Sequence, residues 1–538
     1  MASLRSLVNE WLRLDQNETS RHEIQRLWDE RKTNELEERM RTRIEFGTAG
    51  LRGKMAAGWS CMNDLIIIQA SQGLCQYVLK NVDNAAIRGV VIGHDHRYNS
   101  ERWAELTAGV FISSGFKVYL HRGLVHTPMV PFSVQALNAS CGVYWENAVQ
   151  IIGPHDTGIS ASIKDNLEPK TWMLDQLHSS PLCLDRTADL KQAYFNNLSS
   201  LNLTRLLNGK VPIKFVNTSM HGVSDPFVSR AFESFGFAPY LPVVEQRDPD
   251  PEFPTDLALR TADNHQAPYV LSQDPDGDRF CAAEKGPNGD WIVFTGDQLG
   301  TLFAAQALEV YKASGKPIEK LAMVASTVSS KMIEAMAEVE GFKFVECLTG
   351  FKFIGNTALN LVQQGFEVPF GYEEAIGFMF GSRIRDKDGV AATVSFAELV
   401  TSLLGQGKTV HSYLEEFTID KIFERLRNYD SGPKPAYPHE IAGLAITSVV
   451  DLTTGYDSTN PPTYKPSLPL SSGHMIQFKS EKKEDGTKAS GINVADSTSG
   501  TEPKIKYYIV ANGKDPAVVV EELGTEWMEA EKNNLGRP

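Results

Sequence analysis

One pattern recurs three times along the chain and limits its fold more than any other feature. Each copy contains an apolar segment typical of a buried strand, a helix opened by a small polar residue, a Gly-Phe pair and a second apolar segment. The glycine ends the helix in a left-handed turn, and the phenylalanine starts the return strand. The copies occupy 89–121, 213–237 and 321–345, with the pairs Gly115-Phe116, Gly236-Phe237 and Gly341-Phe342.

The copies are spaced by more than ~100 residues, which is the size of a domain and far above the period of a solenoid repeat. The 538-residue chain is therefore expected to hold three similar α/β domains in tandem, preceded by two helices. From about Asp430 the sequence becomes rich in proline, and its short apolar runs favour a separate α+β module. The expected domains are 1–190, 191–310, 311–429 and 430–538.

The composition is that of a soluble globular protein and excludes several classes of function. With 42% hydrophobic residues and a net charge of −14, the chain is poorly suited to a nucleic-acid partner. The first residues predict an amphipathic helix rather than a signal peptide, and no segment is expected to span a membrane. The six cysteines lack metal-ligand spacing, which favours reduced thiols in a cytoplasmic enzyme.

The segment Asp274-Pro275-Asp276-Gly277-Asp278-Arg279 carries the clearest chemistry. Pro275 and Gly277 prevent a helix, so a loop is expected after the apolar strand 269–271. Three carboxylates packed so closely repel one another unless a cation lies among them, and hard oxygen ligands suit Mg²⁺ better than zinc. Arg279 adds a donor for a phosphate or carboxylate. A solvated acidic turn is the alternative that this segment alone leaves open.

Four further segments collect glycines, hydroxyls and charged side chains. Glycines let a backbone approach an anion closely, adjacent carboxylates suit sugar hydroxyls, and hydroxyls with lysines form a phosphate cradle. Taken singly, each segment is also compatible with an ordinary turn or a solvated charged pair. The segments are 46–53 with Arg52, 348–352 with Lys352, 371–377 with Glu373 and Glu374, and 498–506 with Ser499, Gly500, Thr501 and Lys506.

Together and in this order, these loops resemble those of the α-D-phosphohexomutase superfamily, in its phosphoglucomutase and phosphopentomutase branch. The likeness extends over nearly the whole chain and includes 93–97, 326–330 and 350–355. It implies a monomer with four domains around a central cleft, three of them sharing one α/β fold. It also implies a mutase that interconverts the 1-phosphate and the 5- or 6-phosphate of a sugar through a phosphoserine and a bisphosphate intermediate.

The resemblance assigns a role to most of the loop residues. A magnesium ion would neutralise charge on the transferring phosphoryl group, a sugar bisphosphate would be the activator, and a phosphosugar would be the substrate. Basic residues would assist the transfer, Lys352 as general acid or base, and the last loop would hold the phosphate that is not transferred. The residues are Asp274, Asp276 and Asp278 for Mg²⁺, Arg52, Arg279 and Lys352 for catalysis, and Glu373, Glu374, Ser499, Gly500, Thr501 and Lys506 for the substrate.

The chain departs from this family at the nucleophile. Related chains carry a segment close to Thr-Ala-Ser-His-Asn-Pro, whose serine is phosphorylated, between a strand and a Tyr-Trp pair. Here 141–143 runs directly into Tyr144-Trp145, so that serine and its neighbouring histidine have no counterpart. Ser140 lies at the junction, and the sequence does not show whether it has a role. Without the nucleophile the two-step transfer cannot run as described.

Two smaller departures follow. A short stretch that the family places after Phe253-Pro254-Thr255 is missing, because Asp256 already begins the next predicted helix. Ser497 stands where the family has an arginine two residues before Ser499. Loss of that guanidinium is expected to weaken phosphate binding by ~1–3 kcal/mol.

The same motifs have several interpretations other than an active mutase. An EF-hand loop needs glycine and glutamate where Arg279 and Lys285 stand, and a haloacid-dehalogenase-type phosphatase expects threonine at Asp278. Two other interpretations stay open: a catalytically silent phosphosugar-binding protein, and the product of a faulty gene model that lost in-frame pieces. As for the sugar, Ala375 after the paired glutamates favours ribose or deoxyribose phosphate, with glucose phosphate second.

Overall fold

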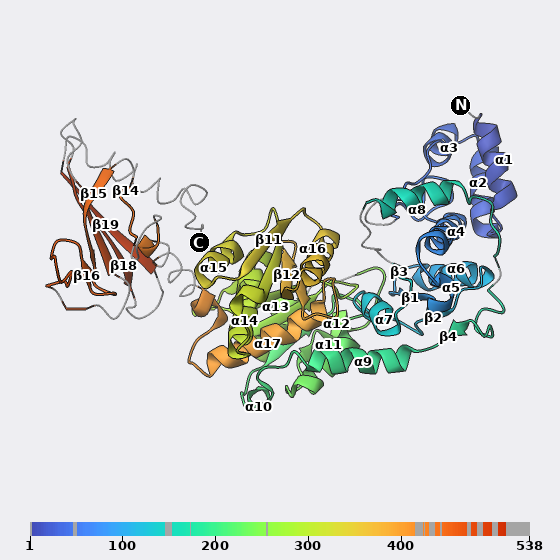
Figure 1. Cartoon of the computed structure of the whole chain (residues 1–538). Helices are drawn as coiled ribbons and strands as arrows, with labels where there is room; N and C mark the ends of the chain where they lie inside the picture. The colour runs from blue at the N-terminus through green and yellow to red at the C-terminus, as the bar shows by residue number, and fades with distance from the viewer. Residues whose placement is uncertain are drawn as a thin grey trace. The chain divides into compact units, whose positions relative to one another are not determined.

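The computed structural model divides the chain into two compact units. By their internal contacts these are the units Met1–Ser402 and Leu403–Pro538. The first unit holds three α/β domains, each built on a sheet of its own (Figure 1). Among the described helices, none combines the length and hydropathy that a membrane span requires. The described residues are 3–46, 51–145, 153–172, 174–253, 257–414, 423, 426–429, 436–441, 444–467, 469–470, 475–480, 488–497 and 504–512.

Five helices, rather than the predicted two, precede the first strand, and the first three are α1 (Leu4–Leu14), α2 (Glu18–Asp29) and α3 (Thr33–Met40). They pack around Trp11, which is fully buried and meets the ring of Trp59 edge-on at 4.9 Å. Burial of such large apolar side chains stabilises this small helical layer.

The first sheet has the strand order β3-β1-β2-β4, and all of its strands are parallel. Parallel strands need crossover helices, and here α6 packs on the sheet while α4 packs on α6 and α8. The helix α9 follows and contacts both α7 and α11. The elements are α4 (Asp64–Asn81), α5 (Ala85–Arg88), β1 (Val90–His94), α6 (Ser100–Ser113), β2 (Val118–Leu120), α7 (Met129–Leu137), β3 (Cys141–Trp145), α8 (His155–Lys164), β4 (Cys183–Leu184) and α9 (Thr187–Ser199).

The second sheet has the order β6-β5-β7-β8-β9. Its first three strands are parallel, whereas β8 and β9 run antiparallel to their neighbours. The elements are α10 (Arg205–Asn208), β5 (Phe215–Thr218), α11 (Asp225–Phe235), β6 (Leu241–Pro242), α12 (Val244–Arg247), α13 (Ala258–His265), β7 (Tyr269–Gln273), β8 (Phe280–Lys285) and β9 (Trp291–Val293).

The third sheet has the order β11-β10-β12-β13, again with parallel strands followed by one antiparallel strand. The helix α14 opens with a capping box, in which Thr295 and Gln298 satisfy each other's backbone amides. The elements are α14 (Gly296–Ala313), η1 (Ile318–Lys320), β10 (Leu321–Ser326), α15 (Met332–Glu340), β11 (Lys343–Cys347), α16 (Phe351–Gln363), β12 (Glu367–Glu373), β13 (Gly377–Phe380) and α17 (Gly389–Leu404).

The threefold pattern of the sequence is confirmed as three similar α/β domains. The glycine of each Gly-Phe pair has a positive φ, between 81° and 84°, and each phenylalanine is buried. One difference separates the copies. In the second and third domains the third strand turns sharply into an antiparallel partner, β7 into β8 and β12 into β13. Among the described residues, β3 of the first domain has no such partner.

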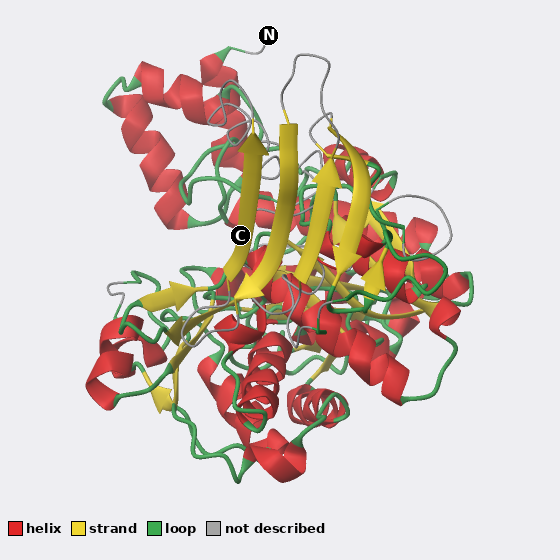
Figure 2. Ribbon diagram, turned by 90° about the vertical axis from the view of Figure 1, so that its left-hand side faces the viewer, coloured by secondary structure: helices red, strands yellow, loops and turns green. Residues whose placement is uncertain are grey.

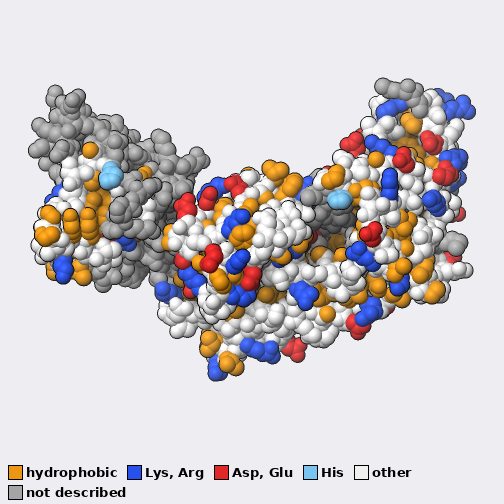
Figure 3. Space-filling model, viewed as in Figure 1, with side chains coloured by type: hydrophobic (Ala, Val, Ile, Leu, Met, Phe, Trp, Pro, Cys, Tyr) orange, Lys and Arg blue, Asp and Glu red, His pale blue; other side chains and the backbone are white. Residues whose placement is uncertain are grey.

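The described part of the C-terminal unit is an antiparallel sheet of order β14-β15-β17-β18-β19, with β16 beside β15 (Figure 2). Buried Asp451, the last residue of β15, accepts bonds from Arg427 Nε at 2.6 Å and Tyr437 OH at 2.8 Å. The strands are β14 (Glu440–Ile441), β15 (Leu444–Asp451), β16 (Tyr456–Asp457), β17 (Met475–Ser480), β18 (Lys488–Ser497) and β19 (Lys504–Asn512). On the face shown in Figure 3, acidic and basic side chains are interspersed on the described surface.

Packing of α4 on α8 gives a test of this architecture. A Cβ added at Gly73 of α4 would lie 2.4 Å from the Cα and 2.6 Å from the backbone nitrogen of Ile163. Alanine normally stabilises a helix relative to glycine, but this backbone cannot move aside. We expect Gly73→Ala to lower the free energy of unfolding by ~1–3 kcal/mol in urea titrations.

The matched control is Gly158→Ala on the facing helix. The atoms nearest to its added Cβ would be those at the far end of Tyr77, a partly exposed side chain that can shift at the cost of its hydrogen bond to His155. The free energy of unfolding of this variant should stay within ~1 kcal/mol of the wild-type value. Equal stability of the two variants would contradict the α4–α8 packing.

Candidate functional site

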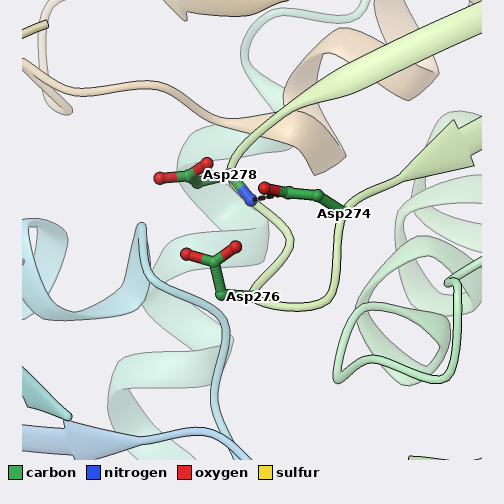
Figure 4. A group of neighbouring side chains, drawn as sticks. All are labelled: Asp274, Asp276 and Asp278. Carbon is green, nitrogen blue, oxygen red and sulfur yellow. Dashed lines mark hydrogen bonds between the residues drawn. The ribbon is translucent and has the colours of Figure 1, made fainter. Parts of the chain in front are cut away.

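The loop 274–279 joins β7 to β8 and brings three carboxyl groups together (Figure 4). One oxygen from each of Asp274, Asp276 and Asp278 lies within 4.8 Å of the others. Asp276 and Asp278 are buried and Asp274 is partly buried. The loop therefore has the donor set that a hard divalent cation requires.

Local hydrogen bonds explain why this sequence folds into a tight turn. Gly277 has a φ of 71°, and its amide donates to the Asp274 carbonyl at 2.9 Å. The Asp274 Oδ1 accepts from the amides of Asp278 at 3.1 Å and Arg279 at 2.9 Å. The turn thus combines a residue that tolerates a positive φ with an aspartate that bonds to the backbone ahead of it.

Each carboxylate has a different partner, and the partners come from three domains. A guanidinium from the loop itself holds the first carboxylate, a hydroxyl from the first domain holds the second, and an ammonium from the third domain holds the last. The three bonds are Arg279 Nε to Asp274 Oδ2 at 2.8 Å, Thr127 Oγ1 to Asp276 Oδ2 at 2.8 Å, and Lys387 Nζ to Asp278 Oδ2 at 3.0 Å.

The protein alone does not neutralise these carboxylates. Burial raises the pKa of Asp274 to about 6, and the charge of Asp276 adds to the shift. Burial also raises the pKa of Asp278 to about 7, although Lys387 opposes it. Burial lowers the pKa of Lys387, but Asp278 and Asp386 raise it more, so the ammonium stays charged. The excess negative charge favours a divalent cation at this loop.

The turn between β12 and β13 lies against the same loop. Phe280 donates its amide to the Ile376 carbonyl at 3.1 Å, next to an isolated bridge that pairs Arg279 with Gly377. Ile376 has a φ of 57°, which a tight turn imposes on a β-branched residue at a cost in strain. Backbone pairing therefore holds this turn of the third domain against the metal loop, residues 274–279 of the second domain.

The two glutamates of this turn point to different partners. Glu374 Oε2 accepts from the hydroxyls of Ser326 at 2.9 Å and Ser329 at 3.3 Å. Glu373 is close to Lys387, because a Cβ built on Gly377 would lie 2.5 Å from Lys387 Cδ and 3.1 Å from Glu373 Oε1. Glu373 therefore faces the metal loop, whereas Glu374 ties the turn to the end of β10.

Comparison with known proteins gives the family. Three profiles match, described as phosphoglucomutase/phosphomannomutase α/β/α domain I over residues 43–147, domain II over 192–288 and domain III over 295–419. The chain is 41% identical to human phosphopentomutase over 560 residues, covering 93% of this chain and 90% of that protein. It is 39% identical to human glucose 1,6-bisphosphate synthase over 585 residues, covering 97% and 92%. The chain belongs to the phosphoglucomutase/phosphomannomutase family.

Solved structures agree with the family fold. A phosphoglucomutase/phosphomannomutase family protein of Burkholderia thailandensis has a TM-score of 0.53 at 14% identity, covering 92% of this chain and 98% of that one. Both human alignments are longer than the 538 residues of this chain, so these relatives contain residues without a counterpart here.

The remaining residues predicted for a phosphoglucomutase/phosphomannomutase site are only partly placed. Lys352 lies in the first turn of α16, with its ammonium 4.7 Å from the ring centre of Phe353 and no ion pair among the described residues. Arg52 is exposed. Lys506 lies in β19 of the C-terminal unit. Outside the described residues are 47–50, Ser499, Gly500 and Thr501.

Ser140 lies at the wrong end of its sheet to serve as the family's nucleophile. Its amide donates to the Gly89 carbonyl and its hydroxyl to the Ala85 carbonyl, both at 2.8 Å. These contacts are at the start of β1 and β3, whereas Thr127, which contacts the metal loop, follows the other end of the parallel strands. A strand of five residues separates the two ends by ~16 Å.

Two residues that contact the loop 274–279, Thr127 and Lys387, were not predicted from the sequence. Lys387 belongs to a run of alternating charge directly before the apolar helix α17, which was a usable signal. That helix starts at Gly389, where a Cβ would lie 2.5 Å from the Arg279 carbonyl oxygen. Thr127 has no local signal, because its partner is 149 residues away.

We expect Mg²⁺ to stabilise the metal-free protein strongly at pH 8 and little at pH 5. Because the pKa is raised to about 6 for Asp274 and about 7 for Asp278, the folded protein binds more protons in acid than the unfolded chain does. Protonation therefore adds to the free energy of unfolding in acid, and this contribution is lost as the pH rises through 7. At pH 8 both groups are ionised and free for metal, whereas at pH 5 protons compete. Scanning fluorimetry should show a rise in Tm of about 5 °C at ~100 Kd. Equal shifts at both pH values would contradict the site.

Lys387→Met should lower the free energy of unfolding much more than loss of a surface lysine does. Lys387 Nζ lies 3.0 Å from Asp278 and 3.7 Å from Asp386, and its side chain is 11% exposed. Removing the cation leaves buried carboxylates unpaired, so we expect a loss of ~3–5 kcal/mol at pH 8 in urea unfolding, and a smaller loss at pH 5.

The control for this prediction is Lys331→Met. Lys331 pairs with Glu346 at 2.6 Å, but its side chain is 45% exposed. Exposed pairs of this kind contribute at most ~1 kcal/mol. If both variants lose the same stability, Lys387 does not compensate the metal loop.

Proposed function

We propose that this chain is built as a magnesium-dependent phosphosugar mutase, with ribose or deoxyribose phosphate as preferred substrate and glucose phosphate second. The observation that carries the proposal is the convergence of three domains on the loop 274–279. The names of the two human relatives, phosphopentomutase and glucose 1,6-bisphosphate synthase, support phosphosugars and a sugar bisphosphate as ligands. We further propose a cytoplasmic monomer with domains at 1–190, 191–310, 311–429 and 430–538.

The described residues can be given roles in this reaction. Asp274, Asp276 and Asp278 would hold Mg²⁺, which when bound supplies positive charge next to the transferring phosphoryl group. Their buried loop keeps the ligands in place before substrate arrives, which is what electrostatic catalysis requires. Glu373, next to Lys387, would accept hydrogen bonds from sugar hydroxyls.

Further roles rest on the family resemblance. Arg52 and Arg279 would bind phosphate oxygens, and Lys352 would transfer a proton to or from a sugar hydroxyl, since its ammonium is not engaged by any described carboxylate. Ser499, Gly500, Thr501 and Lys506 would hold the second phosphate.

A second candidate function has its own support. The strand β3 continues from Val143 through Tyr144 to Trp145 and pairs along the whole length of β1. The family's serine loop belongs at this position, so the chain as written has metal and sugar loops without a nucleophile. Such a chain would bind phosphosugars without turning them over.

Turnover separates the two functions. With ribose 1-phosphate or glucose 1-phosphate and glucose 1,6-bisphosphate, the mutase function predicts turnover by the full chain above a Lys352→Ala control, whereas the silent-protein function predicts none. A chain with the family's Thr-Ala-Ser-His-Asn-Pro loop inserted between Val143 and Tyr144 should gain on the order of 10³-fold or more. The rate would be measured in a coupled spectrophotometric assay.

Two controls make this result decisive. The same insertion with alanine in place of its serine must stay inactive, which shows that the gain comes from the nucleophile. Activity of the original chain above the Lys352→Ala level would disprove the loop argument. Mass spectrometry of the native protein would then show whether its length and phosphorylation match the sequence as written.

A further inference from the structure

Thr127 is the contact through which the first domain reaches the metal loop of the second. It lies between β2 and α7 and is 4% exposed. Its amide donates to the Asp276 carbonyl at 2.9 Å, and its hydroxyl donates to Asp276 Oδ2 at 2.8 Å. One residue therefore fixes both the backbone and the carboxylate of Asp276.

The chemistry of this contact differs from that of the other two carboxylates. Asp274 and Asp278 are each held by a cation, Arg279 and Lys387. A hydroxyl orients Asp276 without neutralising it, so its charge stays available to a metal. The bond engages one oxygen of the carboxylate and leaves the second for coordination. Groups that orient metal ligands in this way typically change metal affinity by about 10–100-fold.

The segment around Thr127 is held rigidly on both sides. Tyr144 of β3 donates its hydroxyl to the Val125 carbonyl at 2.6 Å. On the other side, the Cβ position of Gly277 in the metal loop lies 3.0 Å from His126 Cβ. Thr127 itself is β-branched, which restricts its rotamers and keeps the hydroxyl on Asp276. The end of β3 is thus connected to a metal ligand through three consecutive residues.

We propose that Thr127 is a positioning residue that orients Asp276, so that the metal affinity of the second domain depends on the first domain. This inference rests on the proposed metal site. It gives the first domain a role in metal binding in addition to the phosphoserine that its family carries there.

The test measures Mn²⁺ affinity of the full chain by calorimetry at pH 8, without any need for turnover. Thr127→Val keeps the volume and the backbone bond but removes the hydroxyl, and we expect affinity to fall about 10–100-fold. Thr127→Ala should show a similar loss and serves as a second variant should valine disturb folding. Thr127→Ser keeps the hydroxyl and should remain within about threefold of wild type.

Thr107→Val is the matched control for loss of a buried hydroxyl. Thr107 is fully buried in the same domain and bonds to Ser71 at 3.0 Å, away from the metal loop. This variant should lose thermal stability comparable to that of Thr127→Val but bind Mn²⁺ as wild type does. If Thr107→Val weakens Mn²⁺ as much as Thr127→Val, the effect is structural and the proposal is overturned.

The outcomes also distinguish this inference from the metal site on which it rests. Wild type that binds Mn²⁺ no better than Asp276→Asn would overturn both. Wild type that binds tightly, with Thr127→Val and Thr127→Ala binding equally well, would overturn the role of Thr127 alone. Weakened binding in those two variants with full retention in Thr127→Ser supports it.

Discussion

Repulsion among three closely packed carboxylates, two of them buried, is the interaction on which the rest of this site depends. Without a cation nearby, carboxyl groups this close together and this far from water would stay protonated. The raised pKa values of Asp274 and Asp278 express that tendency. Among the described residues, the cations that contact these carboxylates are Arg279 and Lys387. The remaining negative charge would favour a divalent cation at this loop.

The three domains contribute to this loop in a way that follows from their common topology. In the second and third domains the third strand of the sheet ends in a tight turn and a return strand, and these turns carry the residues proposed to bind the metal and the sugar. Backbone pairing between Phe280 and Ile376 holds the two turns side by side. In the second and third domains the same architecture thus places a turn at the end of the third strand, and the corresponding turn of the first domain would lie between Val143 and Tyr144, within β3.

Much of this could be predicted from the sequence, because it depends on local chemistry. The strands, the helix-ending glycines and the aspartate turn all follow from residues within one element or one loop. The N-terminal region shows the limit, because five helices rather than the predicted two precede β1. Thr127 and Lys387 could not be derived, because their contacts with Asp276 and Asp278 join residues that only the packed domains bring together.

In the part of the chain that the structure describes, the first domain lacks the return strand that follows the third strand of the other two domains. β3 is an edge strand, while its counterparts β7 and β12 are covered by β8 and β13. Among the described residues, no strand pairs with the outer side of β3, which leaves backbone groups that proteins normally cover. A segment restoring the serine loop would also supply this return strand. Within the described residues, an uncovered edge on β3 is what loss of such a segment would leave.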